Sequence, residues 1–66
     1  MDEEKVGKIV AIIRHDLNQT RKDMKDDIER RDYSHASWAQ GKESALQSVL
    51  SLFAAAGIIS HKEAYE

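Results

Sequence analysis

Two long amphipathic stretches, Val6–Ile28 and Trp38–Ile59, make up most of this chain. Apolar residues recur in both at the three- and four-residue spacing of an α-helix, and the chain contains no proline that would break either stretch. Only a short polar segment separates them, and a connection of this length favours two antiparallel helices packed side by side. The sequence therefore predicts an all-α fold built on an antiparallel two-helix hairpin.

Capping residues indicate where the helices begin and end. Acidic residues at positions 2–4 favour a helix N-terminus, and Gly57 is typical of the residue that follows a helix. Ser60 and Glu63 have the spacing of a capping box, which indicates a short C-terminal helical turn. We predict a single domain with helices over 2–31, 37–56 and 60–65 and a turn over 32–36.

Gly41 lies inside the second predicted helix. An interior glycine destabilises a helix by about 1 kcal/mol relative to alanine. We therefore expect a compensating role, in which Gly41 lets another helix or a bulky side chain approach closely. In the predicted hairpin, Met24 of the first helix falls opposite this position.

Each predicted helix has more apolar surface than one partner helix can cover, since its apolar arc spans roughly 160°. The chain has 66 residues and no cysteine, so neither a large core nor disulfides can support it. We expect a homo-oligomer with coiled-coil-like packing, most simply a dimer that forms a four-helix bundle. The predicted oligomer interface comprises Val6, Ile9, Ile13, Leu17, Leu46, Val49, Leu50 and Phe53. The alternative is a monomer whose C-terminal turn folds back over the spare apolar stripe.

Composition and motifs exclude several classes of function. The formal net charge is −2 with both signs intermixed, which argues against binding to nucleic acid. The longest apolar run, residues 52–59, is too short to span a bilayer, and no signal peptide is visible, so we expect a cytoplasmic protein. No phosphate-binding loop, metal-ligand spacing or nucleophile beside a base occurs. We therefore expect a non-enzymatic protein without a metal or cofactor.

Aromatic and basic residues gather around the predicted turn, a combination typical of binding hot spots and of anionic-ligand pockets. The predicted partner-binding residues are Arg30, Arg31, Tyr33, His35, Trp38 and Lys42. A structural role is the alternative: Trp38 fills the thin end of the core, Tyr33 covers it, and the arginines cap a helix. A second polar stripe is either a solvated face or a site for phosphate or an acidic partner. This stripe comprises Arg14, Asn18, Arg21 and Lys25.

Two segments, Tyr33–Phe53 and Gly57–Tyr65, resemble parts of small bacteriophage-type helical-hairpin accessory proteins. The first carries an aromatic residue followed by Gly-Lys, Ala-Leu and Val-Leu, and the second reads as a helix end followed by a capped helix start. The resemblance implies a phage or prophage protein that binds and inhibits a host factor in the bacterial cytoplasm. The leading hypothesis is thus a protein-interaction module. The alternative is an oligomer that sequesters an anionic nucleotide between arginines and aromatics of different subunits.

Overall fold

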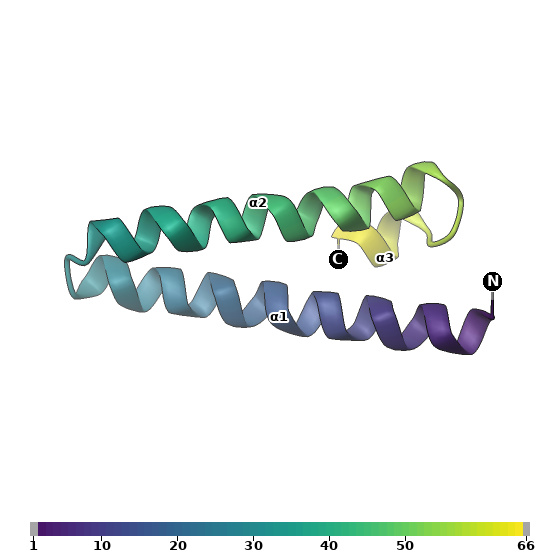
Figure 1. The fold of residues 1–66 in the computed structure, drawn as a ribbon, viewed down its shortest axis with the longest axis horizontal. Coiled ribbons are helices and arrows are strands. Elements are labelled where there is room, and N and C mark those ends of the chain that lie inside the picture. The colour runs from purple at the N-terminus through teal and green to yellow at the C-terminus, as the bar shows by residue number, and fades with distance from the viewer. Residues whose placement is uncertain (1, 66) are drawn as a thin grey trace.

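The computed structural model describes residues 2–65 and contains three helices in this part of the chain. The two long helices, α1 (Glu3–Glu29) and α2 (Tyr33–Ala55), run antiparallel, and the short α3 (His61–Tyr65) folds back beside them (Figure 1). The molecule is a rod of 42 × 18 × 16 Å. The predicted all-α hairpin with a short C-terminal helix is confirmed.

The turn between the long helices is shorter than predicted and lies earlier in the chain. The side chain of Asp32 accepts a hydrogen bond from the His35 backbone N–H at 3.2 Å, so α2 begins at Tyr33 rather than at residue 37. The chain reverses through Arg31, whose φ of 60° lies in the left-handed region. Asp32, Ser34 and Ser37 are all residue types that cap a helix N-terminus, and the first of them starts α2. As a consequence, Tyr33 and His35 lie on α2 instead of in a loop.

The hydrophobic core lies toward the open end of the hairpin, away from the turn. Leu50 is the one large side chain within residues 2–65 that is fully buried. The buried core cluster comprises Val10, Leu17, Leu50, Ile59 and Ala64. Toward the turn the two helices meet through small and polar residues, namely Ala36, Ala39, Thr20 and Asp27. The apolar mass is therefore unevenly distributed along the rod.

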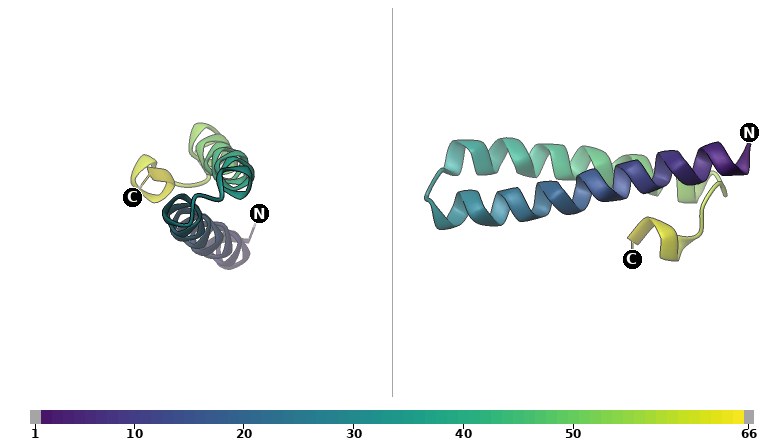
Figure 2. Two further views of the ribbon diagram at one scale, coloured as in Figure 1. Left: turned by 90° about the vertical axis from the view of Figure 1, so that its left-hand side faces the viewer. Right: turned by 90° about the horizontal axis from the view of Figure 1, so that it is seen from below.

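The C-terminal segment covers one side of the hairpin, which we call the closed flank. Gly57, with φ 75°, ends α2 and turns the chain back, and α3 then lies alongside α2 (Figure 2). The Gln47 side chain donates to the Ala64 carbonyl at 3.0 Å, and the Tyr65 hydroxyl donates to Ser51 Oγ at 2.8 Å. These contacts place α3 on the Gln47–Ser51 side of α2 and leave the opposite side uncovered.

Gly41 does not provide the close approach that its position suggested. A Cβ atom added at this residue would meet nothing within 4 Å in the chain. We therefore expect Gly41→Ala to stabilise the fold by about 1 kcal/mol, because alanine reduces the backbone entropy lost on helix formation. Urea denaturation followed by circular dichroism measures this gain. A loss of stability would mean that Gly41 faces a contact that is absent from the single chain.

Candidate functional site

Five side chains form one connected group near the turn, here called the turn-end cluster: Asp16, Asp27, His35, Trp38 and Lys42. The His35 ring nitrogen Nδ1 lies 2.5 Å from the carboxylate of Asp27. The His35 and Trp38 ring centroids are 5.4 Å apart. Lys42, one helical turn further along α2, places its ammonium 5.6 Å from the centroid of the indole ring and 3.1 Å from Asp16. Trp38 is thus held between two polar side chains that α1 carboxylates anchor.

Trp38 does not fill the thin end of the core, although the structural alternative assigned it that role. It is 62% exposed and Tyr33 is 63% exposed, while the small residues Ala36 and Ala39 occupy the space between the helices. Because alanines allow the helices to approach closely there, no room remains for an indole. The only tryptophan of the chain therefore lies on the surface.

The six predicted partner-binding residues are all near the turn but do not form a single cluster. His35, Trp38 and Lys42 belong to the turn-end cluster. Tyr33 projects about 140° away from Trp38 around α2, because each residue of a helix turns the side-chain direction by about 100°. Arg30 ends α1 and Arg31 forms the loop; within residues 2–65 neither takes part in an ion pair. The predicted residues are therefore spread around the turn rather than gathered at one point.

The pKa of His35 is raised above its ordinary value of 6.5. The hydrogen bond to Asp27 and the negative charge of that carboxylate are the main causes, with smaller contributions from Asp32 and Asp23. Desolvation acts in the opposite direction and is outweighed. Within the described residues, no buried polar side-chain atom lacks a hydrogen-bond partner. His35 supplies the side-chain partner of the buried Asp27 carboxylate.

We expect the contribution of His35 to stability to depend on pH. Since its folded-state pKa is raised, the protonated ring stabilises the native state fully below the unfolded value of 6.5, and this contribution disappears as the pH rises through the folded-state pKa. The difference in unfolding free energy between wild type and His35→Gln should therefore be larger at about pH 5.5 than at about pH 8.5. His15 and His61 are present in both chains, so their contributions drop out of this difference in unfolding free energy. A difference that stays constant with pH would contradict this expectation.

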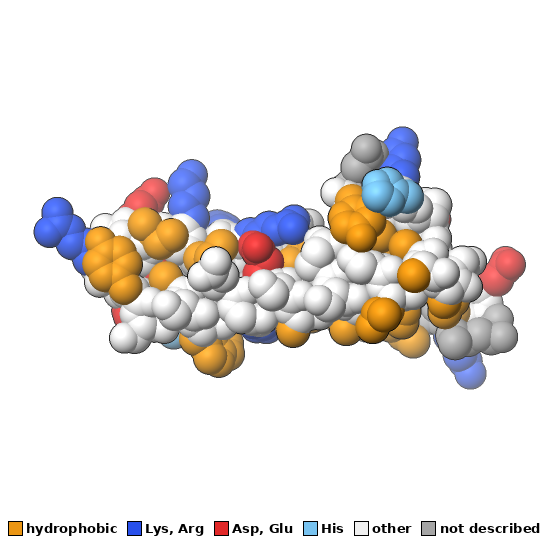
Figure 3. All heavy atoms as spheres, turned by 90° about the horizontal axis from the view of Figure 1, so that it is seen from above, with side chains coloured by type: hydrophobic (Ala, Val, Ile, Leu, Met, Phe, Trp, Pro, Cys, Tyr) orange, Lys and Arg blue, Asp and Glu red, His pale blue; other side chains and the backbone are white. Residues whose placement is uncertain are grey.

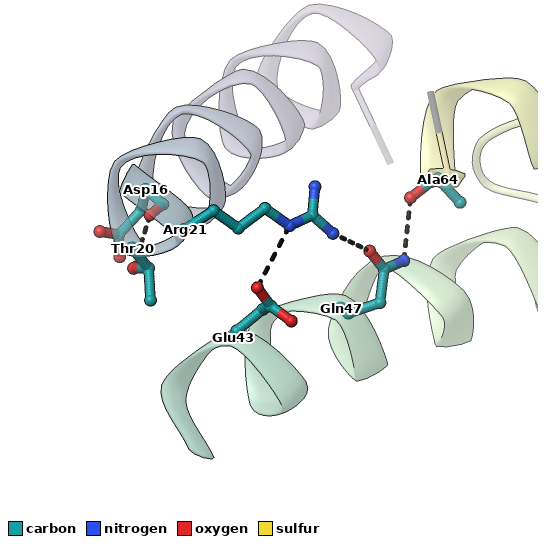
Figure 4. Close-up of polar contacts among 6 residues, drawn as sticks. All are labelled: Asp16, Thr20, Arg21, Glu43, Gln47 and Ala64. Carbon is teal, nitrogen blue, oxygen red and sulfur yellow. Dashed lines mark hydrogen bonds and ion pairs between the residues drawn. The ribbon is translucent and has the colours of Figure 1, made fainter. Parts of the chain in front are cut away.

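Arg21 of the second polar stripe is engaged in the packing of the helices. Its guanidinium donates to Glu43 at 3.3 Å and to Gln47 at 3.4 Å, and Gln47 in turn reaches the Ala64 carbonyl (Figure 4). The chain of hydrogen bonds links all three helices on the closed flank. Arg21 therefore links α1 to α2. Because its guanidinium already donates to Glu43 and Gln47, it is less available to bind an anionic ligand.

The predicted oligomer interface needs correction, because two of its residues lie inside the single chain. Leu17 and Leu50 are buried in the hairpin's own core. Four further residues are partly buried against that core, namely Val6, Ile13, Leu46 and Phe53. Of the predicted set, only Ile9 and Val49 are exposed. The two helices pack against each other through the centres of their apolar arcs, so the edges of the arcs remain available for other contacts.

The uncovered side of the hairpin, here called the open flank, carries an apolar surface that includes Ile9 and Val49 of the predicted interface. Val49 points about 160° away from both Gln47 and Ser51, the residues that hold α3. Ile12 and Leu52 on this side are 69% and 67% exposed. The space-filling view has hydrophobic side chains along the edge opposite α3 (Figure 3). The open flank comprises Ile9, Ile12, Ala45, Val49, Leu52 and Ala56.

An open groove of about 650 Å³ lies where α1 meets the segment between α2 and α3. Its floor is apolar, from Val6, Val10 and Ile59, and its rim carries Glu3, Arg14 and Glu63. Residues 2–65 contain no group of three side chains that could hold a metal ion. Within the same range, none of the helices combines the length and apolar character required to cross a membrane.

The class of protein is thus a small helical hairpin with an exposed aromatic-cationic cluster at its turn. Comparison with protein families, with curated proteins and with solved structures finds no match for this chain.

Proposed function

We propose that this chain is a non-enzymatic binding protein that acts by protein–protein contact through its turn end. The observation that carries the proposal is the environment of Trp38, which is exposed yet held between His35 and Lys42. A large apolar side chain that is oriented before binding loses little conformational entropy in a complex. Tryptophan and arginine are also the residues most enriched at binding hot spots.

The chemistry of the turn end defines the kind of partner that fits it. Trp38 needs an apolar pocket to enter, and Arg30 and Arg31 favour carboxylates beside that pocket. The partner is therefore a protein with an acidic rim around a hydrophobic depression. The resemblance of residues 33–53 and 57–65 to phage accessory proteins supports a host protein of the bacterial cytoplasm as this partner, with inhibition as the outcome.

Two sets of substitutions test the proposal. We expect Trp38→Ala to weaken capture of the partner from a host extract by at least about tenfold, and Arg30→Ala with Arg31→Ala to weaken it less. Alanine meets the same backbone restriction as arginine at the positive φ of residue 31, so this pair removes the side-chain charges without relaxing the turn. Exposed terminal charges contribute little to stability, so helicity should be unchanged.

The control is Lys22→Ala, which removes an exposed cation of α1 that is not part of the turn-end cluster. Quantitative affinity measurements on the captured protein compare the variants with the wild type. If Trp38→Ala and the double arginine variant both bind as tightly as wild type while folding normally, the partner surface lies elsewhere. The stripe from Arg14 to Lys25 is then the next candidate.

A second function is favoured by the geometry of Lys42, whose ammonium lies beside an exposed indole. An indole can stack on a nucleobase while a cation binds phosphate, so an oligomer that sequesters an anionic nucleotide is the alternative. A thermal-shift screen against mono- and dinucleotides separates the two functions. A ligand at 100 times its dissociation constant adds about 2.7 kcal/mol of stability, which is readily detected in so small a domain. Absence of any shift supports the protein-binding proposal.

A further inference from the structure

The single chain exposes more surface than a compact protein of its mass. A monomer of 7.5 kDa typically has an accessible surface of about 4,250 Å². This chain exposes 4971 Å², an excess of roughly 700 Å². A stable protein–protein interface removes about 800 Å² from each partner. The excess is therefore of the size that one standard interface would cover, and the sparse core leaves the hairpin in need of such support.

The open flank presents two parallel apolar stripes on one side of the rod. On α2, the residues Ala45, Val49, Leu52 and Ala56 fall within an arc of about 60°. Lys42 points in nearly the same direction as Val49 and reaches Asp16 on α1, so the side of α1 that carries Asp16 faces the same way. Ile9 and Ile12 lie on that side of α1, directly before Asp16.

The charged residues of the α1 stripe are placed so that two copies of the stripe, laid antiparallel, bring opposite charges together. Lys5, Ile9, Ile12 and Asp16 fall within an arc of about 60°, in the order base, two isoleucines, acid. Lys5 forms no ion pair within residues 2–65. When two such stripes are laid antiparallel, each base meets an acid and each isoleucine meets an isoleucine. The same stripes laid parallel would bring base to base and acid to acid.

We propose that the open flank binds a second copy of this chain about a two-fold axis that runs crosswise to the helices, midway between Ile9 and Ile12. Ile9 of one copy then packs against Ile12 of the other, and Lys5 pairs with Asp16. Val49 and Leu52 lie on the same side and form the equivalent contact between the α2 helices. The resulting four-helix bundle overlaps only at its open ends. Both turns project beyond the overlap, and Asp16 is the one residue of the turn-end cluster that the dimer contact also uses. The dimer does not rest on the proposed function.

The competing arrangement has its two-fold axis along the rod, with α1 of one copy over α2 of the other. It would enclose the Asp16–Lys42 pairs of both copies in the centre of the interface. Withdrawing an ion pair from water is unfavourable unless further hydrogen bonds compensate. In the crosswise arrangement these ion pairs lie at the edge of the dimer interface. The surface that becomes buried is then the apolar part of the open flank, toward the open end of the hairpin. The crosswise arrangement also provides Lys5 with a partner.

The oligomeric state tests which surface is used. We expect light scattering at high micromolar concentration to give twice 7.5 kDa for wild type and 7.5 kDa for Leu52→Lys. Because Leu52 is exposed in the single chain, the variant should retain its helical circular dichroism. Ile12→Lys is a second such variant. Ile28→Lys is the matched control, an exposed isoleucine near the turn that should leave the dimer intact. A wild-type mass of one chain or of three or more chains overturns the proposal, as does a dimer that survives both flank variants.

Disulfide trapping tests the direction of the axis. Because the chain has no natural cysteine, only the introduced cysteines can cross-link. Mixing Lys5→Cys with Asp16→Cys chains should yield a cross-linked dimer of the two variants under mild oxidation. Lys5→Cys alone should not cross-link, because the two sites lie about 16 Å apart in the crosswise dimer and a disulfide requires Cα atoms within about 7 Å. Cross-linking of Lys5→Cys with Ala56→Cys, in place of Asp16→Cys, would establish the lengthwise arrangement and overturn the crosswise one.

Discussion

Replacing Leu50 by alanine is expected to unfold a large fraction of the protein. Leu50 is 1% exposed and belongs to the buried cluster that joins all three helices. Truncating a fully buried leucine removes its transfer free energy and leaves a cavity, a combined loss of about 2–5 kcal/mol. A domain of this size rarely has more than about 3–5 kcal/mol of stability in total. The substitution should therefore consume most of it.

Urea denaturation monitored by circular dichroism measures this effect. Ile28→Ala is the matched control, because it removes a comparable aliphatic side chain that is 52% exposed. We expect the control to change the unfolding free energy by less than about 0.5 kcal/mol. If Leu50→Ala loses no more than this control, the cluster around Leu50 is not the core of the protein in solution.

Enlarging Ala39 to leucine is expected to have the second-largest effect. Ala39 is 1% exposed at the place where α1 and α2 come together near the turn. Adding a bulky side chain to a closely packed interface forces the helices apart, with a loss of about 1–3 kcal/mol. The displacement should also separate His35 from Asp27, because these residues lie on opposite helices at the same end of the rod.

Two measurements check the effect of Ala39→Leu. Urea denaturation gives the stability, and a pH titration of His35 by nuclear magnetic resonance reports whether its raised pKa falls back toward 6.5. The control Ala55→Leu enlarges an exposed alanine at the end of α2 and should alter neither quantity. An Ala39→Leu chain with wild-type stability and an unchanged His35 titration would show that the helices are not closely packed at the turn end.

The helical architecture could be predicted from the sequence because its causes are local. Each signal that predicts the helices depends on residues only a few positions apart, so these signals specify helix type and approximate ends. They are the apolar spacing, the absence of proline, Asp2 before α1 and Gly57 after α2. The start of α2 was predicted four residues too late because Asp32, Ser34 and Ser37 are all acceptable caps. Which of them is used depends on where the two long helices meet.

The exposure of the candidate sites depended on long-range packing and could not be predicted from the sequence. Trp38 could equally fill the core or lie on the surface until Ala36 and Ala39 were found to bring the helices together. The link between Asp27 and His35 joins two helices, and no local pattern indicates it. The predicted partner-binding residues all lie near the turn, and their division into a cluster and separate residues is a tertiary feature.

The sequence by itself determined that the chain forms two amphipathic helices with more apolar surface than they can bury in each other. Only the tertiary structure decided how that surface is divided. Leu17 and Leu50 enter the core, α3 covers the closed flank, and Ile12 and Leu52 remain exposed. The physical reason is that an apolar arc of roughly 160° is continuous around each helix, so its pattern does not mark which part faces the neighbouring helix. The way the helices cross and the docking of the C-terminal segment determine which part of each arc is buried.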